Sequence, residues 1–360
     1  MEKTFGRVLI TAFLGSMLVS NVAWSWGARG HAMIGRVAAR LVSEQNDRSF
    51  AKPFESKLEM IGHLSNIPDV LWKNADRKIT SRTNPTHFYQ VDTIVENQTF
   101  DTLPKTIKAT VDQLRANCQR SNSLPCYEES TPEALMAKLG SAPWRIQQFT
   151  KKMETALGAI KHNPLKHDDI PYIDEALTYA GIVSHFIGDL TQPLHCAYDY
   201  DGVALGQRGL HSYFEDAIVN VLPLSTPQLI YDYIITNKPF ETIMQTVPLE
   251  LRKDAFAIAL AIALDSNAHL TQLQEMDRDL AIEKKSNDST NHERHGAKRK
   301  PAKEVIDQFQ TFTVARLAVA ADTLAHIWLY SWENAGSPNL EAYQSLFYAL
   351  NPPIIDVDYL

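Results

Sequence analysis

The sequence predicts an all-α protein with a single, mainly helical domain, and two patterns support this prediction. Apolar residues recur at the spacing of one helix face over long segments, most clearly at 249–280 and 305–334. No segment alternates apolar and polar residues for long enough to predict a convincing sheet, although residues 87–100 could hold short strands. A chain of 360 residues is long enough to bury one large core.

The other helices are predicted from apolar periodicity together with start and stop signals. Thr131 and Pro132 form the N-cap and first-turn proline of one helix. Pro193 should end the central helix that begins at Tyr172. The segments predicted before the two long ones are 27–44, a short helix within 65–75, 102–118, the helix from Thr131, 144–161, the helix from Tyr172 and, after a polar loop at 199–209, residues 211–221.

Residues 1–25 are predicted to be a signal peptide that is not part of the fold. Lys3 and Arg7 form a positive n-region, residues 8–19 form an apolar run, and small residues precede a cleavage point after Ser25. The apolar run is too short to span a membrane. The alternative interpretation is a segment that stays attached as an uncleaved anchor. We therefore expect export to the periplasm or the exterior, and a mature domain of residues 26–360 without a membrane span.

Net charge and cysteine content limit the classes of function. The formal net charge is −7, and removal of the leader, which carries a net +1, leaves −8. This charge argues against a broad nucleic-acid-coating surface, although bound metal ions could reverse the field locally. Cys118 and Cys126 can form a local disulfide, which export permits. Cys196 is either a metal ligand or a buried bystander.

Residues 283–303 are rich in Lys and Arg and contain almost no apolar side chain. This composition predicts a mobile basic loop between two helices. Such a loop could contact phosphates, but a solvated loop is the simpler interpretation. His292 and His295 lie within it and are expected to have no role.

The stretch from His185 to His195 carries the strongest chemical signal. His185 and Asp189 are four residues apart, so on a helix they project from one face and could hold a cation such as zinc. An i,i+4 ion pair is the alternative. The flanking residues are apolar, however, and a buried pair of this kind needs further partners, which a metal supplies. Pro193 should redirect the chain and bring His195 near the same site.

Further candidate ligands are individually weak, because each could equally belong to a turn, a loop or a helix ion pair. Apart from Trp26, their residue types are those that bind zinc, and together with the central stretch they indicate a metal centre. The full set is Trp26, His31, Asp69, His87, His185, Asp189, His195, His211 and Glu215.

These motifs resemble those of the zinc-dependent single-strand nucleases of the S1/P1 type. The resemblance rests on Trp26-Gly-x-x-Gly-His31, Asp69, His87-Phe88, the stretch from His185 to His195, and His211 with its partner Glu215. It implies three zinc ions. The first would be held by Asp69, His87, His185 and Asp189. The second would be held by the amino and carbonyl groups of Trp26, by His31 and by Asp189. The third would be held by His195, His211 and Glu215.

The resemblance also implies an endonuclease that acts on single-stranded RNA and DNA and leaves 5′-phosphate ends, with 3′-nucleotidase activity as a further expectation. Two zincs bridged by Asp189 would activate a water, and the third would stabilise the leaving oxygen. Asp69 would orient the attacking water. Phe88 would stack on an unpaired base, although it could instead pack in the core. Lys73 would place a point charge near phosphate.

Two positions depart from the nuclease pattern. The nucleases usually have Asp where this chain has Glu215, whereas the related zinc-dependent phospholipases C have Glu. An Arg often follows Asp69 by about one helical turn, where this chain has Trp72 and Lys73. The alternatives are therefore a phospholipase C acting on phosphatidylcholine-like lipids and a non-enzymatic zinc protein. An open coordination position argues against the latter. The substrate is expected to be single-stranded nucleic acid or nucleotides. No stable protein partner is implied, and a monomer is expected.

Overall fold

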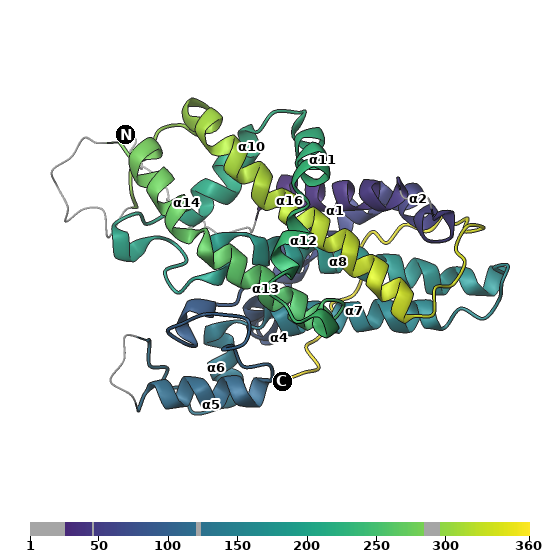
Figure 1. Cartoon of the computed structure of the whole chain (residues 1–360), viewed down its shortest axis with the longest axis horizontal. Coiled ribbons are helices and arrows are strands. Elements are labelled where there is room, and N and C mark those ends of the chain that lie inside the picture. The colour runs from purple at the N-terminus through teal and green to yellow at the C-terminus, as the bar shows by residue number, and fades with distance from the viewer. Residues whose placement is uncertain (1–25, 45–46, 120–123, 284–295) are drawn as a thin grey trace, which may run out of the picture.

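The computed structural model describes residues 26–44, 47–119, 124–283 and 296–360, and these ranges fold almost entirely into helices (Figure 1). The predicted leader and most of the predicted basic loop lie outside the described residues. Within the described ranges, the strand-like pairing is an isolated antiparallel bridge between Ile282 and Arg299. The all-α prediction is therefore confirmed.

The short strands considered for residues 87–100 do not form. Phe88 is extended, with φ −144° and ψ 168°, but the 3-10 helix η3 (Val91–Thr93) follows. The N–H groups of Tyr89 and Gln90 donate to the carbonyls of His195 at 2.9 Å and Leu139 at 2.8 Å. Because these bonds go to two different segments, no ladder develops. They instead fix the main chain directly after His87.

Helix α8 (Ile170–Thr191) occupies the centre of the molecule and is apolar on nearly all sides, as expected of a helix that other helices surround. Pro171 lies in its first turn, where proline is favoured. The helices packed against it are α1 (Gly27–Ser43), α2 (Arg48–Leu64), α7 (Ala142–Gly158), α13 (Ala255–Ala268) and α16 (Ala302–Asn334).

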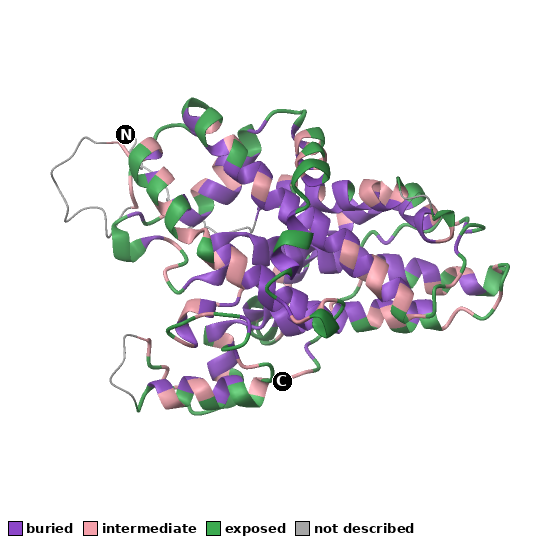
Figure 2. Ribbon diagram, in the orientation of Figure 1, coloured by how far each residue is buried: buried purple, intermediate pink, exposed green. Residues whose placement is uncertain are grey.

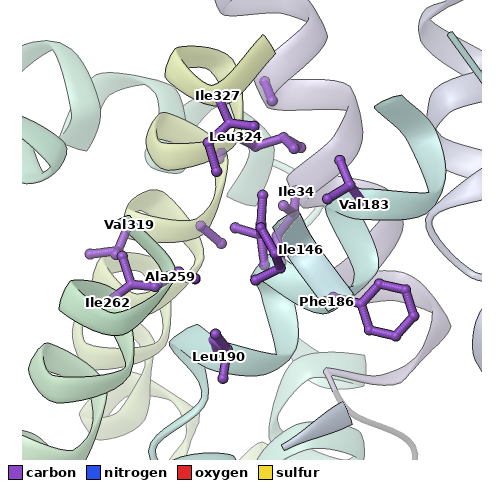
Figure 3. Close-up of a cluster of buried hydrophobic side chains, with 14 of the residues drawn as sticks. Ile34, Ile146, Val183, Phe186, Leu190, Ala259, Ile262, Val319, Leu324 and Ile327 are labelled. Carbon is purple, nitrogen blue, oxygen red and sulfur yellow. The ribbon is translucent and has the colours of Figure 1, made fainter. Parts of the chain in front are cut away.

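The long helix α16 crosses the whole molecule in Figure 1. Among the described helices it alone is long and apolar enough to span a membrane, but 83% of its apolar window is buried inside the protein. Figure 2 shows the buried residues running along α8, α13 and α16. Figure 3 shows side chains of α1, α7, α8, α13 and α16 meeting in one apolar core. Helix α16 is thus a core helix, and it begins three residues before the predicted segment 305–334.

The helices outside this core match the predictions less closely. Helix α6 (Pro132–Leu139) begins as predicted, with the Thr131 hydroxyl accepting from the Ala134 N–H. Helix α5 (Ile107–Asn117) begins later than predicted, because Thr106 caps it. Helices that lie outside the predicted segments are α2, α4 (Arg77–Thr83), α11 (Thr226–Asn237) and α12 (Pro239–Met244).

Shorter helical segments connect these elements. They are α3 (Ile67–Val70), η1 (Trp72–Asn74), η2 (Asn84–His87), η4 (His167–Asp169), η5 (Pro193–Cys196), η6 (Val203–Leu205), α9 (Leu210–Ser212), η7 (Tyr213–Ile218), α10 (Val219–Val221), η8 (Leu249–Leu251), α14 (Leu270–Met276) and η9 (Asp277–Ala281).

The cysteines behave as the sequence predicted. Cys118 and Cys126 form a disulfide between the end of α5 and the segment before α6. Cys196 is buried and free, and its thiol donates to the carbonyl of Leu190 at 3.3 Å. Burial raises the pKa of the Cys196 thiol, so this residue is an inert core side chain.

The described end of the basic stretch differs from a solvated loop. The guanidinium of Arg299 is buried and binds both oxygens of Asp277. The main chain around Arg299 also pairs with the end of η9, through Lys300 N–H to the Ala281 carbonyl at 2.9 Å. Composition alone could not reveal this, because the partner of Arg299 lies in a separate element.

Candidate metal centre

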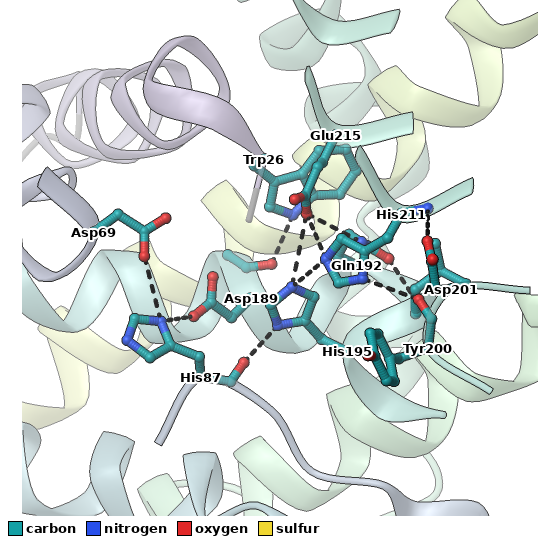
Figure 4. A network of polar contacts seen from close by, with 12 residues as sticks. Trp26, Asp69, His87, Asp189, Gln192, His195, Tyr200, Asp201, His211 and Glu215 are labelled. Atoms are coloured by element: carbon teal, nitrogen blue, oxygen red, sulfur yellow. Dashed lines mark hydrogen bonds and ion pairs between the residues drawn. The ribbon is translucent and has the colours of Figure 1, made fainter. Parts of the chain in front are cut away.

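The candidate ligands predicted from side chains converge in three buried clusters. Figure 4 labels six of them: Asp69, His87, Asp189, His195, His211 and Glu215. In each cluster the possible ligand atoms all lie within 4.8 Å of one another. The first cluster is Asp69, His87 and His185; the second is His31, His185 and Asp189; the third is His195, His211 and Glu215.

Helix α8 is the common support of the first two clusters. His185 and Asp189 lie one turn apart on it, and both are completely buried. His31 reaches them from the first turns of α1, and its ring stacks on that of His185 with centroids 4.1 Å apart. A Cβ atom on Gly188 would lie only 2.9 Å from His31 Nδ1. Gly188 therefore gives His31 the space to reach the cluster.

Two short turns bring Asp69 and His87 to the same place. Asp69 lies in the single-turn helix α3, and His87 ends the 3-10 helix η2. His87 Nδ1 lies 2.9 Å from Asp189 Oδ2 and 3.7 Å from Asp69 Oδ1. Lys73 Nζ lies 2.5 Å from Asp69 Oδ1. Lys73 therefore sits where the sequence predicted a point charge, but it contacts a candidate ligand.

The third cluster forms where Pro193 redirects the chain. The turn η5 places His195 Nε2 at 3.1 Å from His211 Nε2, and His211 Nε2 lies 2.8 Å from Glu215 Oε2. Glu215 belongs to a π-helical segment, a geometry that is rare and frequent at functional sites. Gln192, which was not among the predicted site residues, donates to Glu215 Oε2 at 3.4 Å.

Main-chain carbonyls orient three of the histidines. The Nδ1–H of His185 donates to the Ser65 carbonyl at 2.9 Å. That of His195 donates to the His87 carbonyl at 2.6 Å, and that of His211 donates to the Tyr200 carbonyl at 2.9 Å. These bonds fix the tautomer in which the Nε2 lone pair faces the cluster. Metal-binding histidines almost always have such a partner on the other ring nitrogen.

Several buried polar atoms of the clusters have no hydrogen-bond partner among the described residues. They are both ring nitrogens of His31, Asp69 Oδ2, Asp189 Oδ1 and Glu215 Oε1. Leaving such groups unpaired costs about 1–3 kcal/mol each, and more when they are charged. Nitrogens bound to one tetrahedral zinc lie roughly 3.3 Å apart, since each Zn–N distance is about 2.0–2.1 Å. The His195–His211 separation of 3.1 Å is close to that spacing, so the residues fit bound zinc.

The protonation of His31, His87 and Asp189 suits a bound cation, whereas carboxylates raise the pKa of His185 and of His211 against the effect of burial. Burial lowers the pKa of His31 to about 3 and of His87 to about 4, so both imidazoles are neutral at neutral pH. Burial alone would raise the pKa of the Asp189 carboxyl, but His185 and His87 hold it below its usual range. Neutral imidazoles and ionised carboxylates are the forms that bind metal.

The clusters open onto a cavity of about 550 Å³. Asp69, His87, His195 and His211 form part of its wall, whereas His31, Asp189 and Glu215 lie behind it. The other lining residues are Lys73, Asn74, Asn84, Phe88, Gln90, Leu194, Ala197 and Tyr200. Of these, Lys73 and Phe88 were predicted from the sequence, and Leu194 lies within the stretch from His185 to His195. The others belong to no motif used in the prediction.

Trp26 lies completely buried at the start of α1. Its indole N–H donates to the carbonyl of Gly188 at 2.7 Å, and its ring packs 5.3 Å from that of Phe214. Its φ of 49° is left-handed, which costs a non-glycine residue free energy and occurs most often at functional sites. The preceding residue lies outside the described ranges, so ligation by the α-amino group stays a prediction.

Comparison with known proteins gives a family and one distant relative. The S1/P1 nuclease family model matches residues 26–221, which is more than half of the chain and contains every residue of the three clusters. A protein of Bradyrhizobium tropiciagri described as a probable serine protease is 23% identical over 260 residues, covering 55% of this chain and 32% of that protein. The chain thus spans about a third of that relative's length, and the description applies to the relative.

Proposed function

Because this chain belongs to the S1/P1 nuclease family, a family of zinc-dependent phosphodiesterases, we propose that it is an exported three-zinc endonuclease. Its substrates are single-stranded RNA and DNA, its products carry 5′-phosphate ends, and it also acts as a 3′-nucleotidase. The observation that carries the proposal is the wall of the cavity, where Asp69 and His87 of one cluster lie beside the aromatic ring of Phe88.

The side chains divide the work as follows. Asp69, His87, His185 and Asp189 would hold one ion; His31, Asp189 and the main chain of Trp26 would hold a second; His195, His211 and Glu215 would hold the third. When bound, the ions lower the pKa of water and neutralise phosphate charge. Asp69 faces the cavity and can orient the attacking water. Lys73, whose side chain is 18% exposed beside Asp69, can meet a phosphate oxygen as a point charge.

Phe88 supports a preference for unpaired bases. Its main chain is held on one side by the Ala142 N–H, which donates to the Phe88 carbonyl at 3.2 Å. Its ring lies against Gly140, where an added Cβ would come within 2.6 Å of Phe88 Cδ2. The ring is half-buried and lines the cavity. A base can stack on such a fixed ring only after it has left a duplex, so single strands are favoured.

The test compares purified zinc-loaded protein and its Phe88→Ala variant on single-stranded RNA, single-stranded DNA and duplexes of the same sequence. Wild-type protein should cleave single strands at least roughly 10-fold faster, and the variant should lose part of that preference, because stacking contributes about 1–3 kcal/mol per base. Mass spectrometry of the products should show 5′-phosphate and 3′-hydroxyl ends. Equal rates on duplex and single strands would contradict the proposal.

A zinc phospholipase C is the second candidate, and Glu215 is the observation that favours it. The glutamate fits its cluster, with Oε2 at 2.8 Å from His211 Nε2 and 3.7 Å from His195 Nε2. The two candidates are separated by presenting phosphatidylcholine vesicles beside single-stranded RNA. Release of phosphocholine without RNA cleavage would favour the phospholipase.

Export completes the proposal. Removal of residues 1–25 would create a free amino group at Trp26, which with its own carbonyl forms a five-membered chelate. A free α-amino group has a pKa of about 8, so a zinc ion can displace its proton. The left-handed backbone and the buried indole of Trp26 support a fixed position for these main-chain atoms. The precursor should then be nearly inactive before export to the periplasm or the exterior.

A further inference from the structure

We propose that Tyr200 is a second base-stacking position, so that the cavity holds two neighbouring nucleotides, one on Phe88 and one on Tyr200. This inference rests on the proposed nuclease function and deepens it. It makes dinucleotides and longer strands the preferred substrates, with the bond to be cleaved lying between the two aromatic rings.

The two rings mark different parts of the same cavity. Phe88 directly follows His87 of the first cluster, and both residues line the cavity. Tyr200 lines it as well, and its ring meets that of His211 of the third cluster edge to face, with centroids 6.0 Å apart. In Figure 4, Asp69 and His87 lie on one side of the clusters and Tyr200 lies on the opposite side. A phosphate held between them would have a base position on each side.

The Tyr200 ring stands on a fixed main chain although its side chain is exposed. Its carbonyl accepts the His211 Nδ1–H at 2.9 Å. The loop beyond it is closed by the Gln207 N–H, which donates to the Gly202 carbonyl at 2.7 Å. Asp199 accepts from the Val203 N–H at 2.7 Å. Because the main chain is fixed before the ligand arrives, only the side-chain torsions of Tyr200 remain to be ordered on binding, which favours affinity.

The chemistry around Tyr200 points to a base and not to a phosphate. The neighbouring carboxylates of Asp199 and Asp201 accept main-chain hydrogen bonds from Val203 and His211, and they add negative charge to the loop. A phosphate would be repelled there, whereas the face of a neutral aromatic ring attracts any nucleobase. The ring of Tyr200 is 56% exposed, so a face is accessible.

Tyr198 supplies a matched comparison on the same loop. It is 55% exposed, nearly the same as Tyr200, but it is absent from the lining of the cavity. Isolated exposed aromatic residues are ordinary on protein surfaces. The position of Tyr200 at the cavity, and not its exposure, therefore carries the inference.

The experiment measures kcat/KM for Tyr200→Ala, Tyr200→Phe and Tyr198→Ala on four substrates. These are a dinucleoside monophosphate, its two analogues that lack the base on one or the other side, and a 3′-mononucleotide. Tyr200→Ala should lose about 5- to 100-fold on the dinucleotide, the range that stacking on one base gives. It should keep the wild-type kcat/KM on the analogue that lacks the base stacked on Tyr200, and also on the 3′-mononucleotide. Tyr200→Phe and Tyr198→Ala should resemble wild type on all four.

The outcomes separate this inference from the function on which it rests. Wild-type protein that hydrolyses none of the four substrates would overturn the nuclease function itself. Wild-type activity with an equal loss for Tyr200→Ala on every substrate, or with no loss on any, would overturn only the role of Tyr200. A loss in Tyr198→Ala as large as in Tyr200→Ala would also overturn it, because Tyr198 lies outside the cavity.

Discussion

Two regions of the molecule bury a carboxylate completely, and they satisfy it in different ways. Asp277 is fully buried, and both of its oxygens are bound by Arg299, at 2.6 and 2.8 Å, with Gln207 adding a third bond at 3.0 Å. Asp189 is equally buried, yet its Oδ1 has no hydrogen-bond donor among the described residues. The protein supplies a cationic partner in the first region and leaves a place for one in the second.

The difference between Asp277 and Asp189 indicates that the unpaired atoms of the clusters result from the design of the site and not from loose packing. A buried charge without a partner is far more costly than a paired one. The fold pairs Asp277 with a guanidinium, so it has the means to pair its buried acids. Burial keeps the imidazoles of His31 and His87 neutral. Among the described imidazoles around Asp189, that of His185 alone has a raised pKa, because Asp189 and Asp69 act against the effect of burial.

The largest effect is expected from Asp189→Asn. A neutral amide cannot bridge two dications, so both ions at this residue should be lost. Hydrolysis of single-stranded RNA should fall by more than roughly 100-fold, because even partners of the ligands typically contribute 10- to 100-fold. Elemental analysis and kcat/KM are the measurements. Asp277→Asn, with an equally buried carboxylate removed, is the control and should keep three zincs per chain. Full zinc content in Asp189→Asn would contradict the view that Asp189, unlike Asp277, serves to bind metal.

The next effect concerns the amino terminus at Trp26. A form with a few extra residues before Trp26 should bind one zinc fewer and lose most of its activity, since an amide nitrogen does not replace an amine as a ligand. Trp26→Phe should keep all its zinc, because the ligating atoms belong to the main chain. It should lose about 1 kcal/mol of stability with the indole hydrogen bond to Gly188. Zinc content and thermal unfolding distinguish these outcomes. Equal activity in the extended and native forms would show that the terminus is not a ligand.

A smaller effect is expected at Glu215. Glu215→Ala should lose the third zinc and leave the pair around Asp189 occupied, whereas Glu215→Asp should keep all three and much of the activity. Zinc content measured beside nuclease activity tests both variants. An alanine variant with full zinc and full activity would remove Glu215 from the ligand set.

Stability without metal sharpens the comparison further. Asp277→Asn should destabilise the protein by about 3–5 kcal/mol with or without zinc, because it leaves Arg299 buried and unpaired. Asp189→Asn should destabilise the chelated protein by less, because Asp189 Oδ2 has a partner in His87 Nδ1 at 2.9 Å whereas its Oδ1 has no hydrogen-bond donor among the described residues. Urea unfolding in the presence of a chelator is the measurement. Equal destabilisation by the two variants in chelator would mean that Asp189 is as fully paired within the protein as Asp277.

The smallest effect is expected at Asp92, which lies between the two cases because its hydrogen-bond partner is a neutral group. The neutral N–H of Tyr198 donates to both oxygens of Asp92, at 2.9 and 3.0 Å. Burial raises its pKa to about 6. Because the folded-state pKa lies above the unfolded value, Asp92 should make stability fall as pH rises from about 4 to 6. Asp92→Asn should gain on the order of 1 kcal/mol relative to wild type over that window. A gain independent of pH would contradict this account.

The sequence predicted the core helices and the candidate ligand side chains that the fold brings together, because both leave patterns in side-chain type. Apolar periodicity predicted α1, α13 and α16. In the clusters, His185 and Asp189 lie four residues apart, as do His211 and Glu215, and this spacing places two side chains on one helix face. Helix α2 was missed because Pro53 lies inside it and its backbone is non-helical at Lys57, which interrupts the pattern.

The surroundings of the ligands could not be predicted in the same way. The carbonyls of Ser65 and Tyr200 orient two histidines, but a carbonyl is common to all residues and leaves no mark in the sequence. The burial of Arg299 was missed for a related reason: its charge resembled that of the surrounding basic residues, and its partner Asp277 became visible only in three dimensions.

Tyr200 combines two independent contributions in one residue. Its main chain holds His211, and any amino acid with the same backbone path could do this. Its side chain lines the cavity, where in the proposed role its identity would matter to the substrate. Mutation at this codon can therefore retune substrate choice while the metal centre stays intact. The loop offers natural variation and laboratory evolution a place to change specificity without first losing catalysis.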